Sequence, residues 1–231
     1  MGLPSRFLII CDFAPTFVMD PVLEEARCQV FYFNTVPLRA QTVQKLDPRR
    51  EVYRLVLDTC QELHGPLTIV IIKGMKDGWH DEFENEKKAY QRLESLQGSV
   101  IPTFFGQGTF NGSPVIVISE VVGKTLHALA HSGVPIFLDK LRFKLEKAMC
   151  LVHSCGAEYL DQRLDNFLLC DTGEVMIVDL ESVEFPSNLE DWKESINYGG
   201  VGSLLYLFAD IREYKRKEES NHLGQRPAWR T

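Results

Sequence analysis

Long apolar runs are missing from this 231-residue sequence. A bilayer-spanning helix needs about 20 consecutive apolar residues, and no stretch approaches that length. The apolar residues 7–10 are also too few for the core of a secretory signal peptide, so we expect neither a targeting segment nor a membrane partner. Internal repeats and low-complexity segments are absent as well. With 45% apolar residues, the chain is expected to be globular, with a core for one or two domains.

Positive charge and paired cysteines are also scarce. The formal net charge is −7 and the isoelectric point is near 5.4, whereas nucleic-acid-binding proteins usually carry a basic excess. The 6 cysteines form no Cys-x-x-Cys motif and no zinc-type spacing with histidine. Most of them lie in apolar runs, which favours reduced thiols. We therefore expect a cytoplasmic protein without a nucleic-acid partner.

The stretch 145–179 predicts a helix, a loop and a hairpin. Apolar spacing typical of a helix runs almost to Gly156, which is a common type of residue just after a helix end. Two short apolar strands follow, separated by a turn at residues 171–173. The hairpin brings Asn166 and Asp179 close together, because these residues flank its open end.

Asp161 lies in the loop before this hairpin. Protein kinases use an Asp, an Asn and a second Asp with the spacing of Asp161, Asn166 and Asp179 as a catalytic base and two metal ligands. Mg²⁺ prefers oxygen ligands and typically takes only one or two of them from the protein. An ordinary helix and hairpin with solvated carboxylates would give the same pattern.

A lysine and a glutamate precede this region. Residues 68–73 form an apolar, β-branched strand candidate with Lys73 at its end. Residues 81–96 have helical spacing that places Glu86 on the same face as Tyr90. Glu86 can then point inward toward Lys73, which is the pairing by which protein kinases hold a lysine at the α- and β-phosphates of ATP. The alternative is that Glu86 is one acid on a solvated helix face.

These residues occur in the order found in the protein-kinase-like family, which the chain resembles over residues 51–185. The resemblance is nearest to the small atypical kinases and the aminoglycoside-phosphotransferase-like members. It implies that the protein binds ATP and Mg²⁺. Lys73 would hold the phosphates and Glu86 would orient it, while Asn166 and Asp179 would bind the metal.

The same resemblance implies roles for further residues. Asp161 would be the catalytic base, and Arg163 would supply positive charge near the transferred phosphoryl group. Other positions would border the adenine, although in any fold they would be ordinary residues of a core strand and its loop. The residues expected beside the adenine are Ser119, Glu120, Val122 and Leu168.

The resemblance is incomplete in two places near the site. No glycine-rich loop precedes Lys73, because residues 56–67 contain only Gly65. Glycines let backbone N–H groups approach phosphates, so we expect weaker or differently shaped phosphate cover. Tyr159 and Leu160 replace the His-Arg pair before the kinase base. Regulation through a phosphorylated loop is therefore not expected.

The expected fold class is α+β, with a two-lobed protein-kinase-like fold. Residues 51–122 would form an N-lobe of antiparallel sheet with one helix, and residues 123–231 a minimal helical C-lobe with the catalytic loop. Residues 1–50 form an N-terminal extension that is either an extra layer on the N-lobe or a partner-binding arm. ATP is expected between the lobes.

The function expected from this resemblance is ATP-dependent phosphotransfer to a small molecule or a specialised protein acceptor. Two alternatives stay open. The protein is either a pseudokinase, which uses the same residues to bind a nucleotide or a partner, or a related fold recruited for non-phosphoryl chemistry. The absent glycine-rich loop favours a pseudokinase, whereas the complete set of charged residues favours an enzyme.

Overall fold

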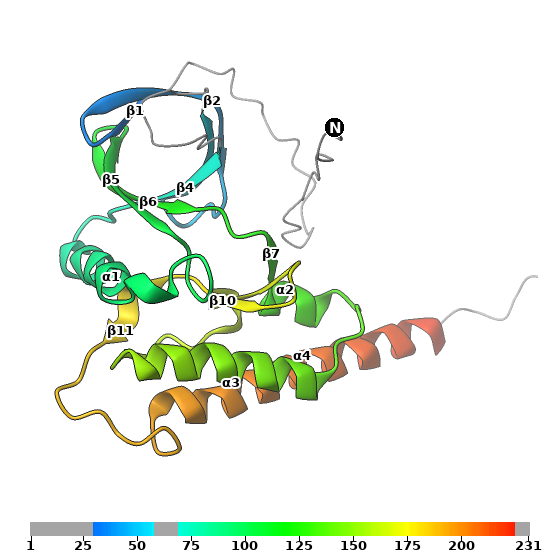
Figure 1. Cartoon of the computed structure of the whole chain (residues 1–231). Helices are drawn as coiled ribbons and strands as arrows, with labels where there is room; N and C mark the ends of the chain where they lie inside the picture. Colours follow the sequence, from blue (N-terminus) through cyan, green and yellow to red (C-terminus); the bar gives the residue numbers. More distant parts are fainter. Residues whose placement is uncertain (1–29, 58–68, 225–231) are drawn as a thin grey trace, which may run out of the picture.

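The computed structural model of the protein describes residues 30–57 and 69–224. The N-terminal part of the described chain is a closed barrel of antiparallel strands in the order β1-β2-β3-β4-β6-β5 (Figure 1). These strands are β1 (Val30–Phe33), β2 (Val36–Lys45), β3 (Val52–Leu57), β4 (Ile69–Gly74), β5 (Phe104–Phe110) and β6 (Ser113–Ser119). Pairing of β1 with β5 closes the ring.

The closed barrel contradicts the expected two-lobed protein-kinase-like fold. Of the predicted fold class, only the mixture of helices and strands is correct. The closure depends on Phe31 of β1 lying opposite Phe110 of β5. It also depends on Gly108, where an added Cβ would lie 2.4 Å from the carbonyl oxygen of Tyr32, so that only glycine lets the two strands approach. Periodicity within one strand does not reveal a pairing between segments so distant in the chain.

Residues 30–50, whose role the sequence left open, supply two barrel strands and the loop that follows them. Phe31 and Phe33 of β1 alternate with the exposed Tyr32 and point into the barrel. They pack there against β4 and β6 side chains, including Ile72 and Val117. Because β1 contributes to this core, it is an integral barrel strand and not an added layer.

β6 is buried on both faces. Val115 and Val117 belong to the barrel core, whereas Ile116 and Ile118 belong to a second core formed with the helices. Successive side chains of a strand point to opposite faces, so a continuous apolar run is what two-sided burial requires. The barrel and the helical part therefore share this strand.

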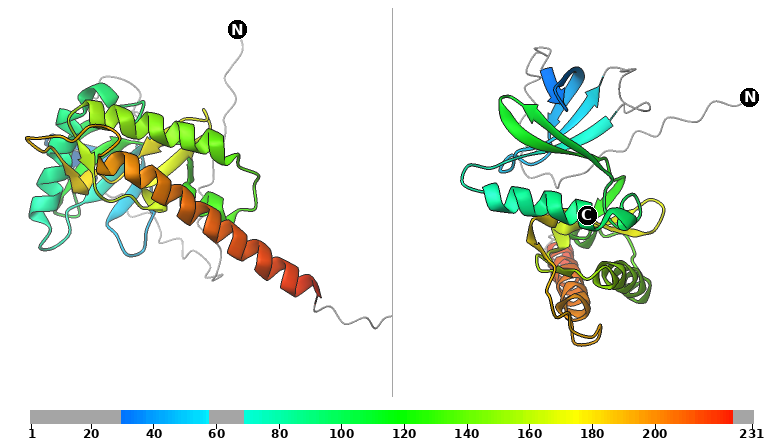
Figure 2. Two further views of the ribbon diagram at one scale, coloured as in Figure 1. Left: turned by 90° about the horizontal axis from the view of Figure 1, so that it is seen from below. Right: turned by 60° about the vertical axis from the view of Figure 1, so that its left-hand side comes forward.

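The helical part lies beside one end of the barrel, with α1 nearest to it (Figures 1 and 2). Its helices are α1 (His80–Arg92), α2 (Leu126–His131), α3 (Leu138–Ser154) and α4 (Ile196–Gly224). Two small sheets lie among them, with strands β7 (Gly123–Thr125), β8 (Glu158–Tyr159), β9 (Phe167–Cys170), β10 (Val175–Ile177) and β11 (Val183–Glu184). The predicted hairpin is present as β9 and β10, and α3 begins seven residues before the predicted helix.

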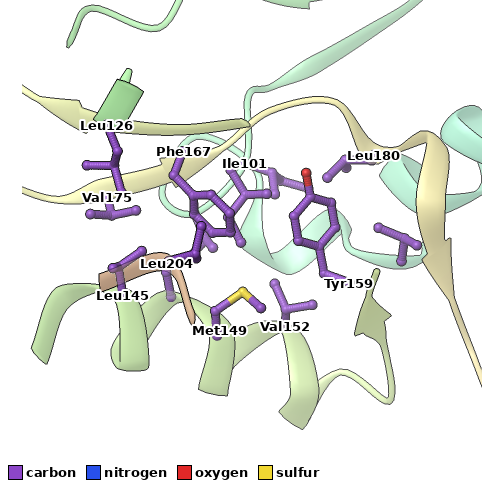
Figure 3. Packing of buried hydrophobic residues seen from close by; sticks show 14 of the residues in the cluster. Ile101, Leu126, Leu145, Met149, Val152, Tyr159, Phe167, Val175, Leu180 and Leu204 are labelled. Carbon is purple, nitrogen blue, oxygen red and sulfur yellow. The ribbon is translucent and has the colours of Figure 1, made fainter. Parts of the chain in front are cut away.

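The second core fills the space between α3, α4 and the small sheets (Figure 3). Leu145, Met149 and Val152 lie at helical spacing on one face of α3 and are buried. They pack near Phe167 of β9 and Leu204 of α4 (Figure 3). This core fixes the hairpin whose end carries Asp179. Among the described residues, no helix is both long and apolar enough to cross a bilayer.

Candidate functional site

Lys73 is the centre of a buried ion cluster. It lies near the end of β4, between Val52 of β3 and Ile116 of β6. Its ammonium nitrogen donates to the Glu86 carboxylate at 2.6 and 2.8 Å. It also donates to Asp179 Oδ1 at 2.9 Å. The cluster thus ties the barrel to α1 and to the segment after β10.

Glu86 lies on the face of α1 that is buried, together with Phe83 and Tyr90. That face follows the 3.6-residue helical period, which is why the sequence pattern could place it. Besides Lys73, the Glu86 carboxylate accepts a hydrogen bond from the Leu180 amide at 3.2 Å. A solvated position for Glu86, the alternative from the sequence, does not match this burial.

Asp179 follows β10 and has a left-handed backbone, with φ 68° and ψ 75°. Such a conformation is uncommon for residues other than glycine, and Asp is one of the few that tolerate it. The buried Tyr159 hydroxyl donates to the carbonyl oxygens of Val178 and Asp179, each at 3.2 Å. In Figure 3 this hydroxyl points away from α3, on the side of Leu180. The core residue Tyr159 therefore supports the backbone that presents the Asp179 carboxylate.

The cluster shifts the protonation of its members. Burial raises the pKa of the Asp179 carboxyl, but Lys73 and Arg50 outweigh it and lower the pKa from 3.8 to about 2. Burial lowers the pKa of the Lys73 ammonium, but Glu86 and Asp179 reverse this and hold it above 10.5. Burial also raises the pKa of the Glu86 carboxyl, and Lys73 offsets this only in part. At neutral pH, Lys73 and Asp179 are therefore charged.

Arg50 is a residue of this cluster that the sequence reasoning missed. Its Nη1 atom donates to Asp179 Oδ2 at 2.7 Å. Arg50 lies in the loop 46–51 between β2 and β3, which contains no glycine. An Asp-Pro pair followed by two arginines between two strands was the available signal in the sequence. The segment 56–67, where the glycine-rich loop was expected, lies mostly outside the described residues.

Glu181 adds a third carboxylate to the cluster. It accepts from Lys76 Nζ at 3.2 Å and lies 3.8 Å from the Lys73 nitrogen. Glu86, Asp179 and Glu181 each offer a carboxylate oxygen within 4.8 Å of the others. Hard oxygen donors of this kind suit Mg²⁺, so the chemistry of the set fits a divalent cation. Both oxygens of Asp179, however, are already paired with Lys73 and Arg50.

Asp161 lies in the loop before β9, with 25% of its side chain exposed. The Asn166 amide donates to its Oδ2 at 2.9 Å and to its carbonyl oxygen at 3.0 Å. Arg163 forms an ion pair with the same carboxylate. The backbone of Asn166 is bonded to the residue before Asp179, because the Val178 amide donates to the Asn166 carbonyl oxygen at 2.9 Å.

The residues expected beside the adenine lie along the connection from β6 to the hairpin. The Ser119 hydroxyl accepts from the Thr103 amide at 2.9 Å. Glu120 accepts from Arg54 Nε at 2.6 Å. Val122 is 40% exposed, and Leu168 of β9 is half-buried. The partners of Ser119 and Glu120 thus come from the segment before β5 and from β3, and not from the Lys73 cluster.

A scan against models of known protein families finds no match, and a search of curated proteins finds none at a significant level.

Proposed function

We propose that this protein is an ATP-dependent phosphotransferase that acts on a small molecule or a specialised protein acceptor. The observation that carries the proposal is the Lys73 ammonium, bonded at 2.6 Å to Glu86 and at 2.9 Å to Asp179. A lysine oriented by a buried glutamate, beside a carboxylate that can bind Mg²⁺, is the arrangement kinases use to hold ATP phosphates. The proposal rests on these side chains and not on the barrel.

Asp161 is proposed to orient the hydroxyl of the acceptor and to accept its proton. Its side chain is 25% exposed, so an acceptor can reach it, and Asn166 holds its orientation at 2.9 Å. General base catalysis of this kind contributes roughly 10²–10⁴-fold to a rate. Arg163 is paired with the same carboxylate, and its proposed role is to supply positive charge near the transferred phosphoryl group.

The proposed cofactor is Mg²⁺, which when bound would neutralise charge on the phosphates. Asp179 and Glu181 are the carboxylates proposed to hold it, with Asn166 as the further ligand implied by the resemblance. Glu86 is less available, because it accepts hydrogen bonds from both Lys73 and the Leu180 amide. Its proposed part is to keep Lys73 extended toward the phosphates.

The direct test is nucleotide binding by calorimetry and thermal shift with millimolar Mg-ATP. A ligand at 100 times its dissociation constant stabilises the folded state by about 2.7 kcal/mol, which thermal shift detects readily. Adenosine with Mg²⁺ is the matched probe that lacks phosphates. We expect Mg-ATP to bind more tightly than adenosine, and a flat result for both heat and melting temperature would contradict the proposal.

A second candidate is a pseudokinase, a nucleotide- or partner-binding module without turnover. The 2.7 Å ion pair between Arg50 and Asp179 favours it, since a guanidinium occupies one carboxylate oxygen that a metal would use. Single-turnover assays with radiolabelled ATP distinguish the two candidates. Hydrolysis or transfer above the buffer rate supports the enzyme, whereas nucleotide binding without any turnover supports the module.

A cytoplasmic location belongs to the same proposal. The cysteines within the described ranges are free thiols: Cys150, Cys155 and Cys170. Free thiols are typical of reducing compartments, which also supply ATP and Mg²⁺. Microscopy of the tagged protein tests the location.

A further inference from the structure

Asp179 has a different cation on each of its oxygens. Oδ1 accepts from Lys73 at 2.9 Å, and Oδ2 accepts from Arg50 Nη1 at 2.7 Å. The Lys73 side chain is 11% exposed, whereas the Arg50 side chain is 32% exposed. Arg50 therefore reaches the cluster from the solvent side, and it is the cation that can leave without uncovering the core.

The loop 46–51 holds Arg50 in a defined position above this cluster. Asp47 accepts from the Arg49 amide at 2.8 Å, and the Arg50 amide donates to the Asp47 carbonyl at 3.2 Å. Pro48 follows Asp47, which is the residue pair typical of the first half of a type I turn. At the far end, the Gly74 amide donates to the Glu51 carbonyl at 2.6 Å, next to Lys73 in β4.

The charges in the cluster predict what happens when a divalent cation binds. Asp179 cannot bind Mg²⁺ through Oδ2 while that oxygen holds Arg50, because the two cations would compete and repel each other. Arg50 then loses Asp179 as a partner. It keeps the weaker ion pair with Asp47, whose Oδ2 lies 3.6 Å from Arg50 Nε, and it stays tethered by its short turn. A guanidinium presents a planar fork of donors that matches phosphate oxygens, and polyphosphate arrives together with the metal.

We propose that Arg50 is a phosphate-binding residue of this site, which holds Asp179 in the free protein and moves to the polyphosphate of the nucleotide when Asp179 takes the divalent cation. This deepens and rests on the proposed function. The cationic loop would then supply through a side chain the phosphate contact that glycine-rich loops supply through backbone N–H groups.

The test compares Arg50→Ala and Arg50→Lys with Arg49→Ala in the full chain. Arg49 is the matched control, because it lies in the same turn, has 90% of its side chain exposed and stays 3.8 Å from Asp47. Calorimetry uses tripolyphosphate, ATP with and without Mg²⁺, and adenosine. Mn²⁺ binding without nucleotide is followed by electron paramagnetic resonance, and circular dichroism checks that each variant is folded.

For Arg50→Ala, we expect affinity for tripolyphosphate and ATP to fall about ten- to hundredfold, the range for losing charged hydrogen bonds. Adenosine affinity should change less than about twofold, since adenosine lacks phosphates. Mn²⁺ should bind more tightly, because a competing cation is gone. Arg50→Lys keeps the charge without the fork and should lie between the wild type and Arg50→Ala, and Arg49→Ala should match the wild type.

Unchanged or tighter polyphosphate and ATP binding in Arg50→Ala would overturn the proposal, because Arg50 would then only neutralise or block Asp179. If Arg50→Ala does not fold, an Arg50→Lys variant with wild-type affinity for tripolyphosphate and ATP overturns it equally. Failure of the proposed function looks different. Arg50-dependent binding of tripolyphosphate without ATP binding supports Arg50 as a phosphate-binding residue and removes the proposed function. Wild-type protein that binds neither anion contradicts both.

Discussion

The two acidic centres of this protein are built in opposite ways. Asp179 lies in a buried cluster whose partners come from distant segments: Arg50 before β3, Lys73 on β4 and, through Lys73, Glu86 on α1. Asp161 is partly exposed, and its partners Arg163 and Asn166 lie within the same short loop. The first centre depends on the tertiary fold, and the second depends on local chain geometry.

This difference matches two tasks of the proposed reaction, which are binding of the nucleotide and metal and activation of the acceptor. A buried carboxylate with fixed cations suits the holding of phosphates and metal, because low local dielectric strengthens each charge interaction. A partly exposed carboxylate held by an amide suits contact with an acceptor that enters from solvent. Substitutions at the two centres should therefore affect stability, binding and turnover in different proportions.

The largest effect is expected for Asp161→Asn. We expect turnover to fall roughly 10²–10⁴-fold, the usual contribution of a general base, while Mg-ATP affinity stays within about twofold. Single-turnover rates and calorimetry measure the two quantities. Asp165→Asn is the control, since Asp165 lies in the same loop with 61% of its side chain exposed. Equal loss of affinity and turnover in Asp161→Asn would assign Asp161 to binding.

Glu86→Ala tests the buried centre through stability. Removing Glu86 leaves the Lys73 ammonium and the Leu180 amide without this acceptor, and breaking a buried ion pair typically costs 3–5 kcal/mol. Urea unfolding should show a loss of about that size. Glu84→Ala on the same helix removes only the ion pair with Lys87 and should cost less than about 1 kcal/mol. Similar losses of unfolding free energy in both variants would mean that the buried cluster stabilises the protein no more than a surface ion pair does.

Acid should weaken the buried centre within a defined window. The pKa of Asp179 is lowered from 3.8 to about 2, so its contribution is complete above pH 3.8 and disappears as pH falls through about 2. A shift of this size corresponds to about 2 kcal/mol of unfolding free energy. Asp179→Asn lacks this titration. The stability difference between wild type and variant should therefore shrink by about that amount from pH 5 to 2, and a constant difference would count against the shift.

The smallest effect concerns the support of the Asp161 loop. A Cβ at Gly200 of α4 would lie 1.0 Å from the Gln162 side-chain oxygen, so Gly200→Ala must displace Gln162. That side chain donates to the Tyr159 carbonyl at 2.7 Å and to the Ile196 carbonyl at 3.1 Å. Losing these bonds should cost about 1–2 kcal/mol in urea unfolding.

Gly202→Ala is the matched control for this prediction. It lies on the same helix, and an added Cβ meets nothing within 4 Å. Alanine has the higher helix propensity, so this variant should gain up to about 1 kcal/mol. A gain of the same size in Gly200→Ala would show that Gln162 relaxes without loss.

Where a single segment carries its own periodicity, the sequence was sufficient to predict the helix, strand or hairpin that it forms. The run that ends at Lys73 and the helix that carries Glu86 each show a pattern of their own, so the strand and the helix could be predicted, whereas their pairing was implied only by the resemblance. The hairpin flanked by Asn166 and Asp179 was equally readable, because its turn residues separate two short apolar strands. Neither case requires knowledge of distant strand pairing.

Arg50 and the barrel required such knowledge. The loop 46–51 meets Asp179 only because β3 pairs with β4 and sets the loop beside Lys73. Closure of the barrel depends on the pairing of β1 with β5, in which Phe33 lies opposite Gly108. Nothing in the short apolar run of residues 30–33 identifies β5 as its neighbour. The predicted kinase-like architecture failed for this reason, since it was carried over from the site residues alone.

The two-sided burial of β6 has a consequence for how the molecule comes apart. Val117 anchors this strand in the barrel, and Ile116 and Ile118 anchor it among the helices. Neither part can lose its core without exposing apolar surface of a strand that the other needs. Heat or denaturant should therefore melt the barrel and the helices in one cooperative transition, and the site at their junction would exist only while both are intact.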